Sequence, residues 1–268
     1  MNTTTTRGRA LQAESRRFPS SASITMLWLK NEIVAWLKEP AAVLLNMAYP
    51  LLMLMFLFLI GGAAVRGNAD IATPAVAMLA LTGVLMVGIN LPANGINGLR
   101  HGDYYYYLRT LPAGVGTRLV AWSGAPFLLA VLSAFVGIAV GVATSAASYT
   151  LSQLGLLLLI FCAFGLCTTA IGVCFGFVLP SRTSLAVSLG LSFILLLLSG
   201  AREMTTLPTA LDETAKLLPS TAAVELCQSA LTDASVGGWW VASLAIWAVV
   251  SLLLATAAIR HDETSKFS

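Results

Sequence analysis

One short stretch of the chain combines aromatic, basic and turn-forming residues that could build a binding surface. It reads GLRHGDYYYYLRTLPAGVGTR and covers residues 98–118. Tyrosine joins a large apolar ring to a polar tip and arginine adds charged donors, and both residue types are enriched at protein interfaces. Tyr104 to Tyr107 go round every face of a helical turn, so we expect part of the run to pack against other residues. An aromatic belt at a membrane surface is the alternative interpretation.

A second polar pattern lies just upstream of this stretch. Asn90, Asn94 and Asn97 follow one another at i, i+4 and i+7, which puts them on one face of a helix, with Pro92 between them. Amide side chains are costly in lipid and should face protein or a water-filled route. The pattern therefore fits two structures: hydrogen bonding between helices, or the lining of a translocation route.

Several motifs that carry catalysis or energy coupling are missing from the sequence. It contains no phosphate-binding GxxxxGK[ST] motif and no HExxH motif. Three of the four cysteines lie in one apolar stretch, and neither His101 nor His261 lies near a cysteine in the sequence, so we expect no metal site. Carriers driven by protons or sodium usually place ionisable residues at mid-membrane depth, and none is found there. If the protein pumps a substrate, the energy should come from another polypeptide.

Composition places these residues in a membrane protein. Of the 268 residues, 57% are hydrophobic and 10% are charged, and the mean hydropathy is +0.84. Ordinary soluble domains carry roughly 25% charged residues. Six stretches without Asp, Glu, Lys, Arg or His are long enough to span a bilayer, and their apolar runs do not alternate as barrel strands would. We predict helices at residues 41–62, 74–98, 119–146, 151–179, 184–201 and 238–259.

The distribution of basic residues predicts the orientation. With the N-terminus inside the cell, twelve of the 15 Lys and Arg residues fall on inside segments. The remaining three, Arg66, Arg202 and Lys216, fall on outside segments. This asymmetry favours cytoplasmic positions for both termini.

The connections outside the spans carry further helix patterns. Residues 24–39 read as an amphipathic helix at the membrane surface, with Met26, Leu29, Ile33, Trp36 and Leu37 clustered on its apolar face. Prolines in the 202–237 connection predict two short helices, one over 209–218 and one ending near residue 231. Helices of this size suit re-entrant or interfacial segments. The expected fold is thus all-α: six transmembrane helices, an N-terminal interfacial helix and two short helices before the last span.

This arrangement resembles the permease subunits of ABC transporters of the type-2 exporter class. The resemblance covers about residues 24–260, and its most specific part is the loop after the second span. There the chain matches the family pattern at Arg100, Gly102, Leu108, Arg109, Leu111 and Pro112. It departs from the pattern at His101, where an acidic residue is usual, and at Asp103, where threonine is usual.

The resemblance implies that transport and ATP hydrolysis are carried out by separate chains. Residues 100–112 would form a coupling helix that docks on a separate ATP-binding subunit, which would hold ATP and Mg²⁺ and hydrolyse the ATP. This chain would carry no cofactor and no catalytic residue. A second permease, identical or related, would pair with it, and an amphiphilic drug, lipid or glycan would pass between the two. The implied coupling residues are Arg100, Gly102, Asp103, Tyr104, Tyr105, Tyr106, Tyr107, Arg109 and Pro112.

We accordingly expect a multi-pass protein of the inner (plasma) membrane that contacts lipid and binds no nucleic acid. Residues 1–23 would be a disordered tail, 24–260 the permease domain with a coupling loop at 99–118 and an outer loop at 202–237, and 261–268 a second tail. An ATP-independent channel or secondary carrier is the alternative function. A membrane enzyme or assembly factor would need a polar catalytic constellation at the surface.

Overall fold

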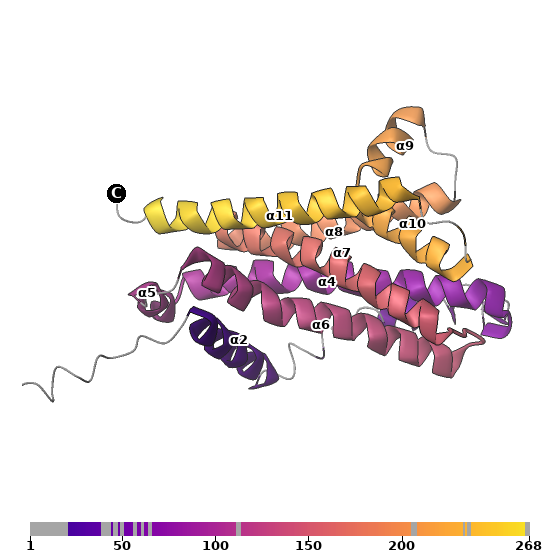
Figure 1. The fold of residues 1–268 in the computed structure, drawn as a ribbon, viewed down its shortest axis with the longest axis horizontal. Coiled ribbons are helices and arrows are strands. Elements are labelled where there is room, and N and C mark those ends of the chain that lie inside the picture. The colour runs from indigo at the N-terminus through magenta and orange to yellow at the C-terminus, as the bar shows by residue number, and fades with distance from the viewer. Residues whose placement is uncertain are drawn as a thin grey trace, which may run out of the picture.

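The computed structural model is a bundle of long helices in the part of the chain that it describes (Figure 1). That part comprises residues 21–38, 66–110, 114–204, 208–232 and 237–265, with isolated positions at 44, 48, 51–55, 58–59, 62–63 and 234. It contains helices and no strand. Five of these helices are long and apolar enough to cross a membrane, which is the character of a polytopic helical membrane protein.

These five helices confirm five of the six predicted spans. The predicted span at 41–62 falls largely outside the described residues. The others begin and end within a few residues of the predictions, and the last continues beyond its predicted end. They are α4 (Ala69–Arg100), α6 (Val115–Thr144), α7 (Leu151–Val178), α8 (Ser181–Met204) and α11 (Gly238–Ser265).

Helix α4 is the centre of the bundle and contacts α6, α7 and α8 along its length (Figure 1). Its 32 residues would extend about 48 Å, well beyond the roughly 30 Å of a bilayer core. Small residues allow the close packing between α4 and α7. A Cβ atom at Gly172 would lie 2.5 Å from the carbonyl oxygen of Ile89, and one at Gly176 would lie 2.7 Å from Cβ of Ile96. The Gly172–Gly176 pair therefore serves packing within this chain.

The short helices lie at opposite ends of the bundle. Helix α2 (Ser21–Lys38) and helix α5 (Asp103–Thr110) lie at one end, which we call the α5 end. Helices α9 (Thr209–Lys216) and α10 (Pro219–Thr232) lie toward the other, the α9 end, where α9 projects away from the bundle (Figure 1). Helices thus occur near the positions where the sequence predicts one before the first span and two before the last, and their interfacial or re-entrant character stays a prediction.

The face that α2 turns toward the bundle overlaps the predicted apolar face only in part. Leu29, Ile33 and Trp36 are half-buried, as predicted. Met26 and Leu37 are instead 68% exposed, and Trp28 and Glu32 are half-buried in their place. Packing against the neighbouring helices sets the rotation of α2, and hydropathy along the chain does not encode it. Leu29 reaches into the space above Gly124 of α6, and the Thr25 hydroxyl donates to the Thr117 hydroxyl at 3.2 Å.

Candidate functional site

A short helix joins the two long helices α4 and α6 at the α5 end. Helix α4 ends at Arg100, and the chain turns through His101 and Gly102, whose N–H donates to the Leu99 carbonyl at 3.0 Å. Helix α5 then begins at Asp103, and α6 begins at Val115 after Gly114. The predicted coupling residue Gly102 thus lies in the turn, and Asp103, Tyr104 and Arg109 lie on α5. Pro112 lies outside the described residues.

The tyrosines of α5 divide between the inside and the outside of the bundle. Tyr105 is 2% exposed, whereas Tyr106 and Tyr107 are 58% and 59% exposed. This confirms that part of the run packs against other residues. Tyr105 anchors α5, and the two exposed rings leave an aromatic surface on the same short helix.

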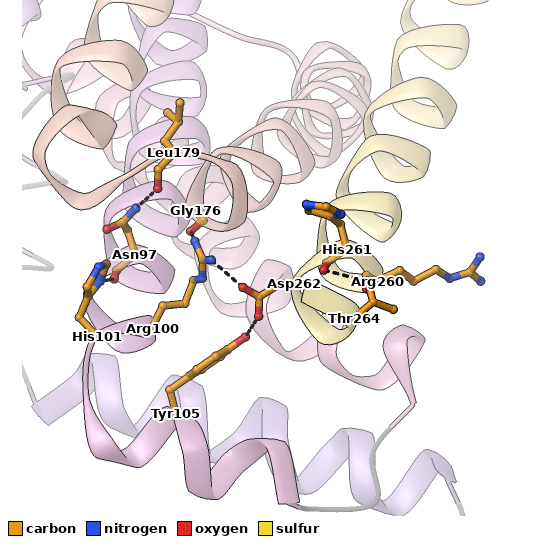
Figure 2. A network of polar contacts seen from close by, with 10 residues as sticks. All are labelled: Asn97, Arg100, His101, Tyr105, Gly176, Leu179, Arg260, His261, Asp262 and Thr264. Atoms are coloured by element: carbon orange, nitrogen blue, oxygen red, sulfur yellow. Dashed lines mark hydrogen bonds and ion pairs between the residues drawn. The ribbon is translucent and has the colours of Figure 1, made fainter. Parts of the chain in front are cut away.

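The anchor of α5 is a buried polar network centred on Asp262 of α11 (Figure 2). The Tyr105 hydroxyl donates to Oδ2 of Asp262, and Nη2 of Arg100 donates to Oδ1 at 2.6 Å. Nη1 of the same guanidinium donates to the carbonyl of Gly176 at 3.2 Å. Asp262 is only 3% exposed, so these hydrogen bonds take the place of the water that its carboxylate would otherwise bind. One carboxylate therefore joins α4, α5 and α11, and Arg100 also reaches α7.

Aromatic rings fill the space around this network. Trp122 of α6 stacks on Tyr105 with ring centroids 6.4 Å apart and lies 4.9 Å from the Phe177 ring. The Arg100 guanidinium lies 5.6 Å from the centroid of Phe177, within the range of a cation–π contact. These rings exclude water from the carboxylate and strengthen its electrostatic interactions.

A second ion pair links α11 to the start of α6. Nη1 of Arg118 lies 2.7 Å from Oε1 of Glu263, and the Arg118 side chain is almost fully buried. Together the neighbouring carboxylates of Asp262 and Glu263 hold both ends of the α4–α6 connection. Residues 261–265, which the sequence analysis grouped with a tail, continue α11 and belong to this packed end.

The three asparagines of α4 make hydrogen bonds within the protein. Asn90 donates to the Met86 carbonyl at 2.9 Å and to the Ser192 hydroxyl of α8 at 3.3 Å. Asn97 donates at 2.6 Å to the Leu179 carbonyl, just after α7. Asn94 donates to the Asn90 carbonyl at 2.8 Å and lines a cavity. Asn90 and Asn97 thus make hydrogen bonds to other parts of the bundle, while Oδ1 of Asn90 is buried without a hydrogen-bond partner, and the lining of a route by these residues stays a prediction.

An apolar cavity of about 470 Å³ lies toward the α9 end. Met78 and Leu85 of α4, Leu196 of α8 and Val224 of α10 contribute apolar walls, and Gln228 of α10 contributes an amide. Its size is in the range of small-molecule sites. The cavity lies along the half of α4 that precedes the asparagines.

Sequence reasoning missed Asp262, Glu263, Arg118 and Trp122. A signal was present in the composition, because the chain has only 12 acidic residues and two of them are adjacent just after the last predicted span. Their partners could not be read from the sequence, since 162 residues separate Arg100 from Asp262. Within the described ranges, no cluster of three His, Cys, Asp or Glu residues could hold a metal ion.

Comparison with known proteins gives no family for the chain. Neither the models of known protein families nor the curated protein sequences contain a match to it.

Proposed function

We propose that the chain is the permease subunit of an ATP-driven exporter of the type-2 ABC class, with α5 as its coupling helix. The proposal rests on the resemblance in the 100–112 loop and on the missing energy source within the chain. A partner chain would bind and hydrolyse ATP, and a second permease would complete the route. The orientation that agrees with this proposal puts the α5 end in the cytoplasm.

The observation that supports it most directly is the two-sided character of α5. One side is fixed by Tyr105, which is buried against Asp262, and the other presents Tyr106 and Tyr107 at well over half exposure. A docking helix needs both properties, because a force applied to its exposed side reaches the membrane helices only if the helix is held firmly to them.

The Asp262 network suggests how movement would spread. Arg100 and Tyr105 bond to one carboxylate, so a displacement of α5 would act on α4 and α11 together. The Arg118–Glu263 pair would carry the same displacement into α6. Closure of two ATPase subunits would thereby tilt several spans as one unit and open the route on the outer side.

The cargo class follows from what lines the interior. Described spans contain no ionisable residue at mid-depth, and the cavity between α4, α8 and α10 has mostly apolar walls. We therefore favour an amphiphilic cargo over a highly charged one, and we infer that this cavity would face the route formed with the second permease.

The test is purification in mild detergent from the native membrane, followed by mass spectrometry of the associated chains. We expect a P-loop ATPase to co-purify and its ATPase rate to depend on the permease. Replacing Tyr106 and Tyr107 by alanine should remove the ATPase, because these rings are exposed and their loss leaves the Tyr105 anchor intact. The control is Trp239→Ala, which removes an exposed ring on α11.

Retention of the ATPase by the Tyr106→Ala/Tyr107→Ala variant would contradict the coupling role of α5. Recovery of the chain alone, with substrate flux that does not need ATP, would contradict the whole proposal and favour a channel or secondary carrier.

A further inference from the structure

A cavity of about 610 Å³ lies where α2 meets α4, α5 and α6, and we call it the α2 cavity. Helix α2 packs closely along α6, while the Trp36 ring bridges the gap from α2 to α4 near Gly95. The space left between them is closed at the end of the bundle by Tyr107 and Leu108 of α5. The described lining residues come from all four helices, so the cavity is built by the tertiary fold.

The α2 side of this cavity is one continuous helix face. Trp28, Asn31, Glu32, Ala35 and Trp36 line it at i, i+3, i+4, i+7 and i+8, the spacing of residues on one side of a helix. The face places a carboxylate between two indole rings. Glu32 and Trp36 are half-buried in the bundle.

The lining of the α2 cavity combines several aromatic rings with a single carboxylate. Three of the six tryptophans in the chain, Trp28, Trp36 and Trp122, line the cavity together with Tyr107. Glu32 is the one carboxylate, and no Lys, Arg or His occurs among the described lining residues. Burial raises the pKa of the Glu32 carboxyl above its usual value, so the anion would be stabilised by a bound cation.

We propose that the α2 cavity binds an organic ammonium group on an apolar carrier, with Glu32 as the counter-ion and the tryptophans and Tyr107 as the aromatic wall. Aromatic rings attract ammonium ions through the negative potential of their faces, and enclosure of the cation strengthens the attraction. A carboxylate beside the rings neutralises the charge. The cavity of about 610 Å³ is large enough for a tetraalkylammonium ion, or for the ethanolamine head group of a lipid together with the first part of its acyl tails.

Gly98 provides a way to close the cavity without removing the charged group. It lines the cavity, and a Cβ added there would meet no atom within 4 Å, so a larger side chain would project into open space. Gly98→Leu should therefore fill the cavity and leave α4 helical, since leucine favours helix more than glycine. Gly155→Leu in α7 is the matched control, because its added side chain also meets no neighbour and lies outside the cavity lining.

The experiment measures binding to the purified full chain, without any ATPase, so its outcome is independent of the transport proposal. In the first arm, radiolabelled tetrapropylammonium is titrated onto protein in phosphatidylglycerol nanodiscs. In the second arm, native mass spectrometry counts phosphatidylethanolamine and phosphatidylglycerol retained from an equal mixture. The variants are Glu32→Gln, Gly98→Leu, Gly155→Leu and Glu213→Gln, the last an exposed glutamate on α9.

We expect saturable binding that falls roughly tenfold or more in Glu32→Gln, because the amide keeps the shape of the side chain and removes the charge that attracts the ammonium ion. Gly98→Leu should lose binding as well, while Gly155→Leu and Glu213→Gln should bind as the wild type does. Binding in the first arm alone identifies a free amine as the ligand, and selective retention of phosphatidylethanolamine in the second identifies a lipid head group. Absence of binding in both arms, or equal binding by wild type and Glu32→Gln, would overturn the proposal.

Discussion

At the α5 end of the bundle, buried charges hold α11 to the α4–α6 connection, whereas neutral hydrogen bonds hold the α9 end together. The carboxylates of Asp262 and Glu263 pair with Arg100 and Arg118 across long separations in the sequence. At the α9 end, the Ser220 hydroxyl donates to the Leu195 carbonyl at 3.1 Å, and the Trp247 indole donates to the Leu217 carbonyl at 2.6 Å. Lys216 there pairs near the surface with Asp212 and Glu213 of its own helix.

The difference bears on how each end can respond to force. Separating a buried ion pair leaves a desolvated charge behind, so the contact between α11 and the α4–α6 connection resists partial opening. Separating a neutral hydrogen bond costs less, and water can replace the lost partner once the helices move. The α5 end is therefore suited to transmit movement as a unit, and the α9 end is suited to open and close.

The largest effect should come from Asp262→Asn. Arg100 would keep its position and lose its counter-ion in a buried setting, so the free energy of unfolding should fall by about 3–5 kcal/mol. Denaturant unfolding of the protein in detergent micelles measures this free energy. The control is Asp212→Asn at the α9 end, whose pair with Lys216 lies near the surface and for which we expect a change of less than about 1 kcal/mol. Equal losses in the two variants would remove the contrast between the ends.

Tyr105→Phe should produce the next largest effect. It keeps the ring against Trp122 and removes only the hydroxyl that donates to Asp262, so unfolding should become easier by about 1.5–3 kcal/mol. Tyr106→Phe changes an exposed ring in the same helix and should cost less stability than Tyr105→Phe. If the two variants behave alike, the hydroxyl of Tyr105 contributes nothing to the anchor.

Ser220→Ala tests the α9 end and should cost about 1 kcal/mol, the net value of one neutral hydrogen bond. The Leu195 carbonyl also accepts from Ser199, which limits the loss. Ser229→Ala in the same helix removes a hydroxyl that bonds to its own helix at Leu226, and its effect should be smaller. A loss for Ser220→Ala as large as that for Asp262→Asn would contradict the comparison.

The smallest effect should be a pH dependence from Glu32 at the α5 end. Because burial raises its folded-state pKa above 4.5, the neutral form is favoured in the folded protein. The stability that the neutral Glu32 carboxyl contributes is fully present below pH 4.5, the ordinary pKa of the group, and is lost as the pH rises through the raised pKa of the folded state. Without ligand, Glu32→Gln should have a higher unfolding temperature than wild type near neutral pH, and the two should converge in acid.

Two results would contradict this expectation: unfolding temperatures of wild type and Glu32→Gln that do not converge in acid, or a wild type that becomes more stable as the pH rises above 4.5. Either result would show that ionising Glu32 in the folded protein costs little free energy. The α2 cavity would then lack the desolvated carboxylate on which ammonium binding depends.

Much of the fold was predictable because its determinants are local. An apolar run of sufficient length has to form a helix in lipid, and this predicted α4, α6, α7, α8 and α11 to within a few residues at most ends. Pro208 and Pro219 likewise marked the short helices α9 and α10. The division of the tyrosine run between packed and exposed side chains was also predictable, since no single helix face holds four consecutive residues.

Which tyrosine is buried, and on what, was decided by the tertiary structure. Helical periodicity places Tyr105 on a face but does not say which neighbour that face meets, because the rotation of each helix about its axis is set by packing with the others. The pairing of Arg100 with Asp262 depends on the same rotations and on the register of α4 against α11. So does the inward turn of Trp28 and Glu32 on α2, because hydropathy placed both residues among the polar positions, beside the predicted apolar face. The sequence by itself determined a helical membrane protein with a short aromatic helix between two spans, since helix formation depends on neighbours along the chain. The packed structure alone decided the buried carboxylate network and the α2 cavity, since both depend on side chains that meet only when distant helices come together.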